Sequence, residues 1–98
     1  MSERFLIEVA HENTMGACLH AIEVFHKTGS HFLTHADWGC KDGVHKAWIM
    51  VDVDSESEAR GIVPPAFRSV AKIVGVTHFT LAEIEPALRK LEERARRG

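Results

Sequence analysis

The chain has 98 residues, of which 45% are hydrophobic and 27% charged, and its formal net charge is −2. This composition is that of one small globular domain. It has no apolar run long enough to span a membrane, and an acidic chain binds phosphates poorly. We therefore expect neither a membrane nor a nucleic acid as a partner.

The N-terminal sequence predicts a cytoplasmic protein, because residues 1–4 lead directly into a strand pattern rather than into the apolar segment of a signal peptide. In the cytoplasm Cys18 and Cys40 are expected to be reduced thiols. Cys18 falls on the core side of a predicted helix, and Cys40 falls in a predicted hairpin loop. We expect the two residues to lie too far apart for a disulfide and Cys40 to be the more exposed.

Alternating apolar residues predict the first strand over residues 4–10. A polar loop follows, in which Asn13 or Thr14 can cap a helix. Apolar residues at helical spacing, Met15, Cys18, Leu19, Ile22 and Phe25, then predict that helix over residues 15–27, and Gly29 is expected to end it.

Residues 30–38 and 44–53 are predicted to form the second and third strands. The loop between them, residues 39–43, carries the Asp-Gly pair that is typical of a tight hairpin. The two strands should therefore be antiparallel neighbours.

Two capping boxes mark the starts of later helices, because Ser55 and Thr80 are each followed three residues on by a glutamate. The first of these helices should end before Pro64, since the residue before a proline avoids helical geometry. Residues 71–79 are predicted as the fourth strand. Pro86 is expected to kink or restart the C-terminal helix.

The predicted order is βαββαβ with a trailing helix. This is an α+β fold of ferredoxin-like type, with a four-stranded antiparallel sheet in the order 4-1-3-2 and its helices on one face. Residues 1–80 form the domain. Residues 81–98 form a C-terminal helix that we expect to pack on the same domain or on a dimer partner.

Strand parity divides this sheet into two faces. The apolar face, expected beneath the helices, collects Phe5, Ile7, Val9, Phe32, Ala36, Trp38, Ala47, Ile49, Val51 and Val53. The open face collects Leu6, Glu8, His31, Leu33, His35, Asp37, Lys46, Trp48, Met50 and Asp52. A hairpin register with Asp37 opposite Lys46 also matches His31 with Asp52. Since the helices cannot cover both faces, a ligand, the C-terminal helix or a second subunit must cover the open face. A homodimer interface is favoured, because it accounts for both the apolar and the polar residues there.

The hairpin, the segment 45–53 after it and the pair Pro64-Pro65 resemble the dimeric α/β-barrel superfamily, which includes antibiotic-biosynthesis monooxygenases and muconolactone isomerase. Within that superfamily the chain is similar to small bacterial ferredoxin-like proteins, one of which binds nickel. The resemblance covers most of residues 4–79. It implies a dimer in which two sheets pack face to face, with ligands between each sheet and its helices or loops.

Seven histidines, together with carboxylates and thiols, suit a first-row transition metal such as Ni, Zn, Cu or Fe. His35 and Asp37 would lie about 6.6 Å apart on one side of a strand, which makes them the preferred pair. His31 and His35 would be about 13 Å apart, too far to share an ion.

The strand order also predicts two histidine groups at the ends of the sheet. One contains His45, His78 and Cys40, and the other contains His11, His31 and Asp52. The predicted metal ligands are His35, Asp37, His45, His78 and Cys40.

These residues support two hypotheses of function. The first is a cytoplasmic homodimer that binds a transition metal or a small ligand on the His/Asp-bearing face. The alternative is a cofactor-free isomerase or monooxygenase-like enzyme, with Glu8, His35, Asp37 and Lys46 for acid–base chemistry and Trp48 and Met50 as ligand-binding walls. A weaker alternative is nucleophilic chemistry at Cys18, in the first turn of a helix, assisted by His11 or His20.

Overall fold

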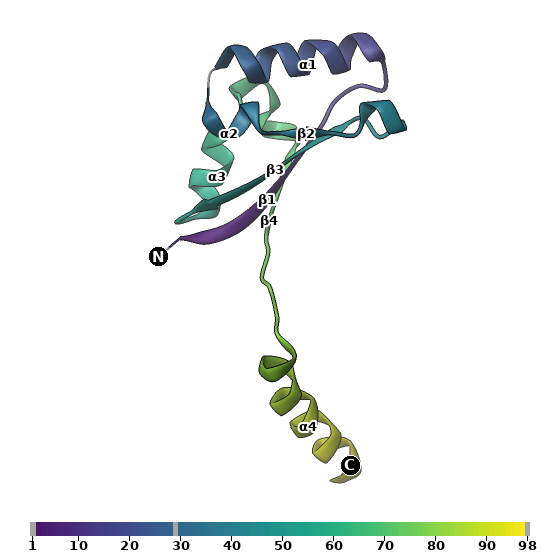
Figure 1. Cartoon of the computed structure of the whole chain (residues 1–98), viewed down its shortest axis with the longest axis vertical. Coiled ribbons are helices and arrows are strands. Elements are labelled where there is room, and N and C mark those ends of the chain that lie inside the picture. The colour runs from purple at the N-terminus through teal and green to yellow at the C-terminus, as the bar shows by residue number, and fades with distance from the viewer. Residues whose placement is uncertain (1, 29, 98) are drawn as a thin grey trace.

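The computed structural model describes residues 2–28 and 30–97 of the chain. Its elements are β1 (Glu3–Ala10), α1 (Met15–Thr28), α2 (His31–Thr34), β2 (Asp37–Trp38), η1 (Cys40–Asp42), β3 (Lys46–Val53), α3 (Glu56–Ile62), η2 (Pro65–Val70), β4 (Ala71–Gly75) and α4 (Leu81–Arg97). The sheet and the first three helices form a body, from which α4 stands away (Figure 1). The helix end expected at Gly29 lies outside the described residues.

The sheet has the strand order β2-β3-β1-β4, which is 4-1-3-2 when it is read from the β4 edge. Each neighbouring pair is antiparallel. The α+β class, the four-stranded antiparallel sheet and the C-terminal helix are therefore confirmed. In the described part of the chain, none of the helices has the length and apolar character needed to cross a membrane.

One face of the sheet carries the core, and strand parity predicts it correctly for β1 and β3. The buried residues of these two strands all belong to the face expected beneath the helices: Phe5, Ile7, Val9, Ala47, Ile49 and Val51. Phe25 from α1, Leu33 from α2 and Ala59 from α3 complete this core. The helices that follow β1 and β3 therefore share one side of the sheet.

Thr14 caps α1, as predicted, because its Oγ1 accepts a hydrogen bond from the amide of Ala17 at 3.0 Å. The buried face of the helix differs from the expected one. Cys18, Ala21 and Phe25 are buried, whereas Met15 and Leu19 are 54% and 60% exposed. The face of α1 that packs on the core is therefore rotated relative to the face that the spacing of its apolar residues predicts.

The predicted second strand is wrong over most of its length, since residues 31–34 form α2 and only Asp37–Trp38 join the sheet. The side chains of this segment bond locally: Thr34 Oγ1 donates to the carbonyl of His31 at 3.0 Å. The helical turn buries Leu33 completely and leaves Phe32 37% exposed, which reverses their predicted faces. The register is also different, because Asp37 lies opposite Trp48 rather than Lys46.

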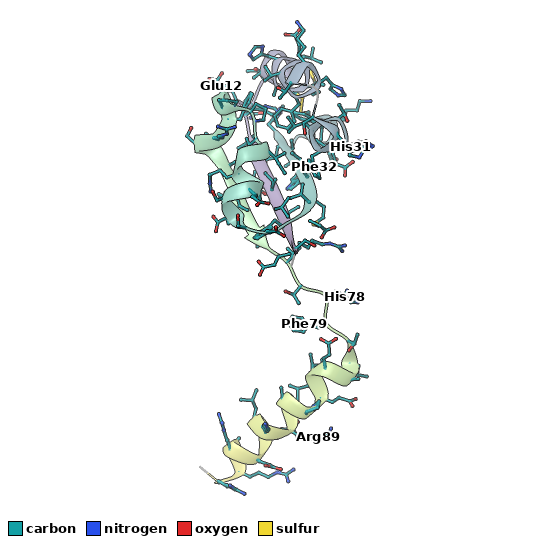
Figure 2. All side chains as sticks on the ribbon, turned by 90° about the vertical axis from the view of Figure 1, so that its left-hand side faces the viewer. Glu12, His31, Phe32, His78, Phe79 and Arg89 are labelled. Carbon is teal, nitrogen blue, oxygen red and sulfur yellow. A yellow bond between two sulfur atoms is a disulfide. The ribbon has the colours of Figure 1, made fainter. Side chains whose placement is uncertain are left out.

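The fourth strand ends at Gly75, four residues earlier than predicted. His78 and Phe79 instead lie in the segment that leads to α4 (Figure 2). The helix α4 then continues from Leu81 to Arg97 past Pro86, so the expected restart is wrong. Pro86 lies early in the helix, where the carbonyl that loses its amide partner can bind water.

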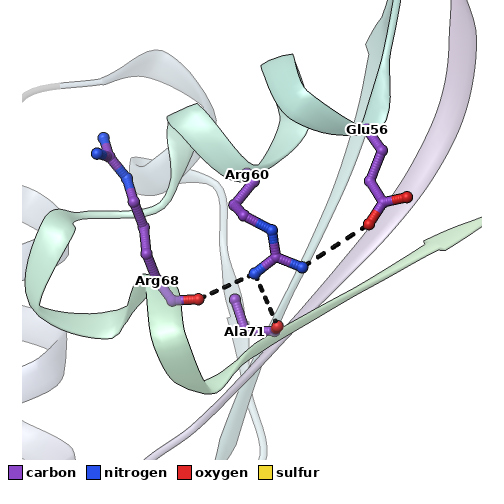
Figure 3. Close-up of polar contacts among 4 residues, drawn as sticks. All are labelled: Glu56, Arg60, Arg68 and Ala71. Atoms are coloured by element: carbon purple, nitrogen blue, oxygen red, sulfur yellow. Dashed lines mark hydrogen bonds and ion pairs between the residues drawn. The ribbon is translucent and has the colours of Figure 1, made fainter.

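Arg60 on α3 connects three segments of the body (Figure 3). One guanidinium nitrogen donates to the carbonyls of Arg68 and Ala71 at 3.0 and 3.2 Å. The other lies 3.8 Å from the Glu56 carboxylate, one helical turn away. These contacts hold η2 against α3 and fix the start of β4.

We expect Ser55→Ala to lower the free energy of unfolding by about 1 kcal/mol. Ser55 accepts a hydrogen bond from the amide of Glu58 at 3.1 Å and caps α3. Ser30 is a matched control, because it stands at the N-cap of α2 without a side-chain cap bond. Urea unfolding should therefore show a loss for Ser55→Ala and none for Ser30→Ala. Equal losses would contradict the cap.

Candidate functional site

The candidate site lies at the end of the sheet where β1 stops and β3 begins. His11 follows β1, Cys18 lies in the first part of α1, and Cys40 lies in η1 of the hairpin before β3. One donor atom from each of these three residues lies within 4.8 Å of the other two. In the part of the chain that the structure describes, this is the group of His, Cys, Asp and Glu side chains that is compact enough to hold a metal ion.

The hairpin turns back on itself and so buries Cys40. The amide of Gly43 donates to the carbonyl of Cys40 at 3.1 Å, and the amide of Val44 donates to the carbonyl of Gly39 at 3.0 Å. Gly43 has a φ of 79°, which favours glycine. Cys40 is consequently only 8% exposed, and the predicted exposed loop thiol is wrong.

Cys18 and Cys40 form a disulfide, with their Cα atoms 6.6 Å apart. The sequence predicts two separate, reduced thiols, and that prediction is wrong. The folded-back hairpin brings Cys40 against the first turns of α1, where Cys18 is 1% exposed. The prediction of a buried Cys18 is confirmed.

The ring of His11 is oriented by a backbone carbonyl. Its Nδ1 lies 2.9 Å from the carbonyl oxygen of Glu12. Because a carbonyl can only accept, Nδ1 is the donor in this contact, and in the neutral ring Nε2 then has the free lone pair. Nε2 lies 3.2 Å from Sγ of Cys40. Imidazoles that bind metals are commonly held this way, with the remote N–H on a carbonyl and the other nitrogen free.

Two further rings surround His11. The centroid of the His45 ring lies 5.3 Å from that of His11, edge to face, and the Trp38 ring lies 6.1 Å away. The amide of His11 donates to the carbonyl of His45 at 3.1 Å. His45 Nδ1 is buried and has no hydrogen-bond partner among the described residues. The cluster therefore has a second imidazole beside it with an unused polar atom.

An open pocket of about 720 Å³ lies beside His11, between the start of α1 and η2. Its lining combines apolar side chains with two imidazoles and a carboxylate: Ala10, His11, Glu12, Thr14, Ala17, His20, Ala66, Phe67 and Val70. Glu12 is labelled at this end of the body in Figure 2. The pocket reaches His11 but is not lined by either cysteine.

Three of the residues predicted for the open sheet face do meet. One carboxylate oxygen of Glu8 accepts a hydrogen bond from Trp48 Nε1 at 3.2 Å, and the other lies 3.5 Å from Lys46 Nζ. Met50 lies on the same face and is 54% exposed. Glu8 is thus held by two partners on a half-open surface.

His35 and Asp37 do not share a strand face. His35 follows α2, where its Nδ1 lies 2.8 Å from the carbonyl oxygen of His31, whereas Asp37 is in β2. The helical turn also places the His31 and His35 rings 4.5 Å apart, so the separation expected for a strand is wrong. Both histidines are exposed.

Neither predicted histidine group forms as a whole, because Cys40 and His45 lie at the hairpin end of the sheet and His78 does not. His78 lines a second pocket with Ser2, Arg4 and Asp52 at the start of β1 and the end of β3. Because β1 and β3 are antiparallel, this end of the sheet is opposite to the hairpin. The structure instead brings His11 to His45 and Cys40, and Asp52 pairs with Arg4 at 3.2 Å.

Comparison of the chain with protein-family models, with curated proteins and with solved structures finds no match. The site must therefore be interpreted from its own chemistry. Sequence reasoning missed the grouping of His11 with Cys18 and Cys40. The strand order contained a signal for this grouping. When β1 and β3 are antiparallel neighbours, the end of β1, the start of α1 and the hairpin before β3 all lie at the same end of the sheet.

We expect reduction of the disulfide to lower the free energy of unfolding by about 3 kcal/mol, because the bond closes a loop of 22 residues. Thermal unfolding with and without a phosphine reductant measures the difference. Cys40→Ser is the control and should be insensitive to the reductant. A wild type that unfolds identically in both conditions would show that the bond adds nothing to stability.

Proposed function

We propose that this chain is a small metal-binding protein that holds a first-row transition metal through His11, Cys18 and Cys40 after the disulfide is reduced. The observation that carries the proposal is the convergence of the three donor atoms within 4.8 Å. The fixed tautomer of His11 supports it, because the nitrogen that faces Cys40 is the one with the free lone pair.

This donor set selects among metals. Two thiolates and one imidazole suit Zn, Cu(I), Ni or Fe and disfavour Mg and Ca, which prefer oxygen ligands. The same two sulfur atoms can bond to each other or, as thiolates, to a metal. Metal binding and disulfide formation are therefore mutually exclusive states of one site.

We propose the cytoplasm as the place where the site is loaded. Thiol pools there keep most cysteine pairs reduced, which is the state that a metal requires. An oxidising compartment would hold the chain in the disulfide state and leave His11 without thiolate partners.

We further propose a ferredoxin-like homodimer of the dimeric α/β-barrel type. The strand order supports the ferredoxin-like assignment. The open sheet face keeps Met50 and Val74 54% and 52% exposed, and a second copy of the chain would cover them.

The helix α4 supports the same dimer. Its apolar residues recur at alternating spacings of three and four, the pattern of a helix that packs along one seam: Leu81, Ile84, Leu88 and Leu91. All four are exposed in the single chain, and so is every other residue of α4. We propose that this seam packs on the dimer partner.

A second candidate function is acid–base chemistry on the open sheet face. It is favoured by the contacts of Glu8 with Trp48 and Lys46, which fix a carboxylate beside an aromatic wall. Asp37, which pairs with Trp48 in the sheet, would complete this enzyme of isomerase or monooxygenase type, whereas His35 lies apart at the end of α2. The metal-binding proposal is the stronger one, because its donor groups already converge.

The metal site is tested by loading reduced protein, made without an affinity tag, with Zn²⁺ or Ni²⁺ under anaerobic conditions. Elemental analysis after gel filtration should find about one metal per chain in the reduced protein and none in the oxidised protein. His11→Ala and Cys40→Ser should each weaken binding by more than about 100-fold, because loss of an outer-shell partner alone costs up to that much.

His35→Ala and Asp37→Ala are the matched controls for the metal site, since they remove a histidine and a carboxylate from the earlier predicted pair. Both variants should retain the metal. If they lose it while His11→Ala keeps it, the site is the pair indicated by the sequence and the cluster is excluded.

The dimer is tested by sedimentation of the wild type, Met50→Asp and Leu88→Asp. Each of the two variants puts a charge into an apolar surface that we assign to the interface, so each should shift the chain toward monomer. Lys90→Asp, on the polar side of α4, should leave the dimer intact. A monomeric wild type would contradict the proposal.

A further inference from the structure

We infer that His45 is the fourth ligand of the metal, so that the site is a closed one with two imidazoles and two thiolates. This inference rests on the metal-binding function proposed above. It concerns the coordination of the ion and therefore the kind of work that the metal can do.

The first observation is the unused nitrogen of His45. Its Nδ1 is buried and lacks a hydrogen-bond partner among the residues described. Leaving a buried polar atom unpaired costs about 1–3 kcal/mol, and such atoms are uncommon in folded proteins. A metal that accepts the lone pair of this nitrogen would remove that cost.

The second observation is the position of His45 relative to the other three residues. The hydrogen bond from the His11 amide to the His45 carbonyl continues the β1–β3 ladder by one residue beyond Ala10 and Lys46. The two imidazoles are therefore cross-strand neighbours, with centroids 5.3 Å apart. Cys40 lies in the same hairpin as His45, so two of the four ligands come from one short segment of the chain.

His45 lies outside the compact group in the disulfide-bonded state. Within the described chain, only His11, Cys18 and Cys40 satisfy the 4.8 Å limit while the two sulfur atoms are bonded. Reduction separates the sulfur atoms and opens space between them. Ligation by His45 requires its ring to move toward the sulfur atoms once they are apart.

A fourth protein ligand would make the site a closed one. The pocket beside His11 is lined by neither cysteine nor by His45, so of the four proposed ligands a small molecule in it would contact only His11. Four-coordinate sites of this kind serve structure, storage or sensing, whereas catalytic sites keep one position for water or substrate. The metal would then be cargo or signal rather than a Lewis acid.

Co²⁺ is the probe, because its visible spectrum reports both thiolate ligation and coordination number. The reduced wild type should give the intense bands of a tetrahedral thiolate complex, and added azide should leave them unchanged. In His45→Ala and His45→Gln, water takes the fourth position, and azide should shift the bands. His26→Ala, which removes an exposed histidine from α1, should match the wild type.

The outcomes separate the two proposals. If the wild type forms the thiolate complex but responds to azide as strongly as His45→Ala, or if His45→Ala resists azide, the role of His45 is refuted and the metal site stands. If the wild type forms no Co²⁺–thiolate complex, the proposed function fails and the fourth ligand with it. Thermal unfolding of the oxidised, metal-free variants, within a few degrees of the wild type, shows that each has folded.

Discussion

Eight residues of β1 pair with eight residues of β3, from Glu3 opposite Val53 to Ala10 opposite Lys46. This pairing determines which side chains of the two central strands face the helices and which face outward. It also determines which chain segments meet at each end of the sheet. His11 extends the ladder at one end, so the cluster with Cys18 and Cys40 depends on the register of this one strand pair. A slip of one residue would invert both faces and separate the cluster.

The sequence predicts well where a simple period or a short local motif is decisive. The alternation of Phe5, Ile7 and Val9 identifies the core face, and Thr14 and Ser55 cap their helices as their side chains suggest. Residues 31–34 show where this reasoning fails. The apolar residues of this segment fit two patterns. Their alternation fits a strand, whereas the three-residue spacing of Leu33 and Ala36 fits a helical turn equally well. The need to bury Leu33 against β3, a tertiary effect, favours the turn.

The candidate site was harder to predict, because its residues are far apart in the chain. The Asp-Gly hairpin predicts an exposed loop for Cys40, but the loop folds back through η1 and Cys40 bonds to Cys18 at the start of α1. The prediction that groups His78 with His45 is wrong, because antiparallel pairing places the start of β1 beside the end of β3 and not beside its beginning. Strand parity alone is enough to predict that Glu8 and Lys46 lie on the same face of the sheet, where they form an ion pair. Cys18 and Cys40 come together only through the tertiary fold, so no local pattern in the sequence predicts their contact.

The position of α4 has a consequence for how the chain is divided. The core contains residues of the sheet, α1, α2 and α3, and it closes without any residue after Ile73. The connecting segment, which includes the exposed His78 and Phe79, lies between that closed core and the helix. The packing of the core therefore does not depend on the sequence of α4. Substitutions in α4 can therefore change that helix while the group of His11, Cys18 and Cys40, at the opposite end of the sheet, keeps its geometry.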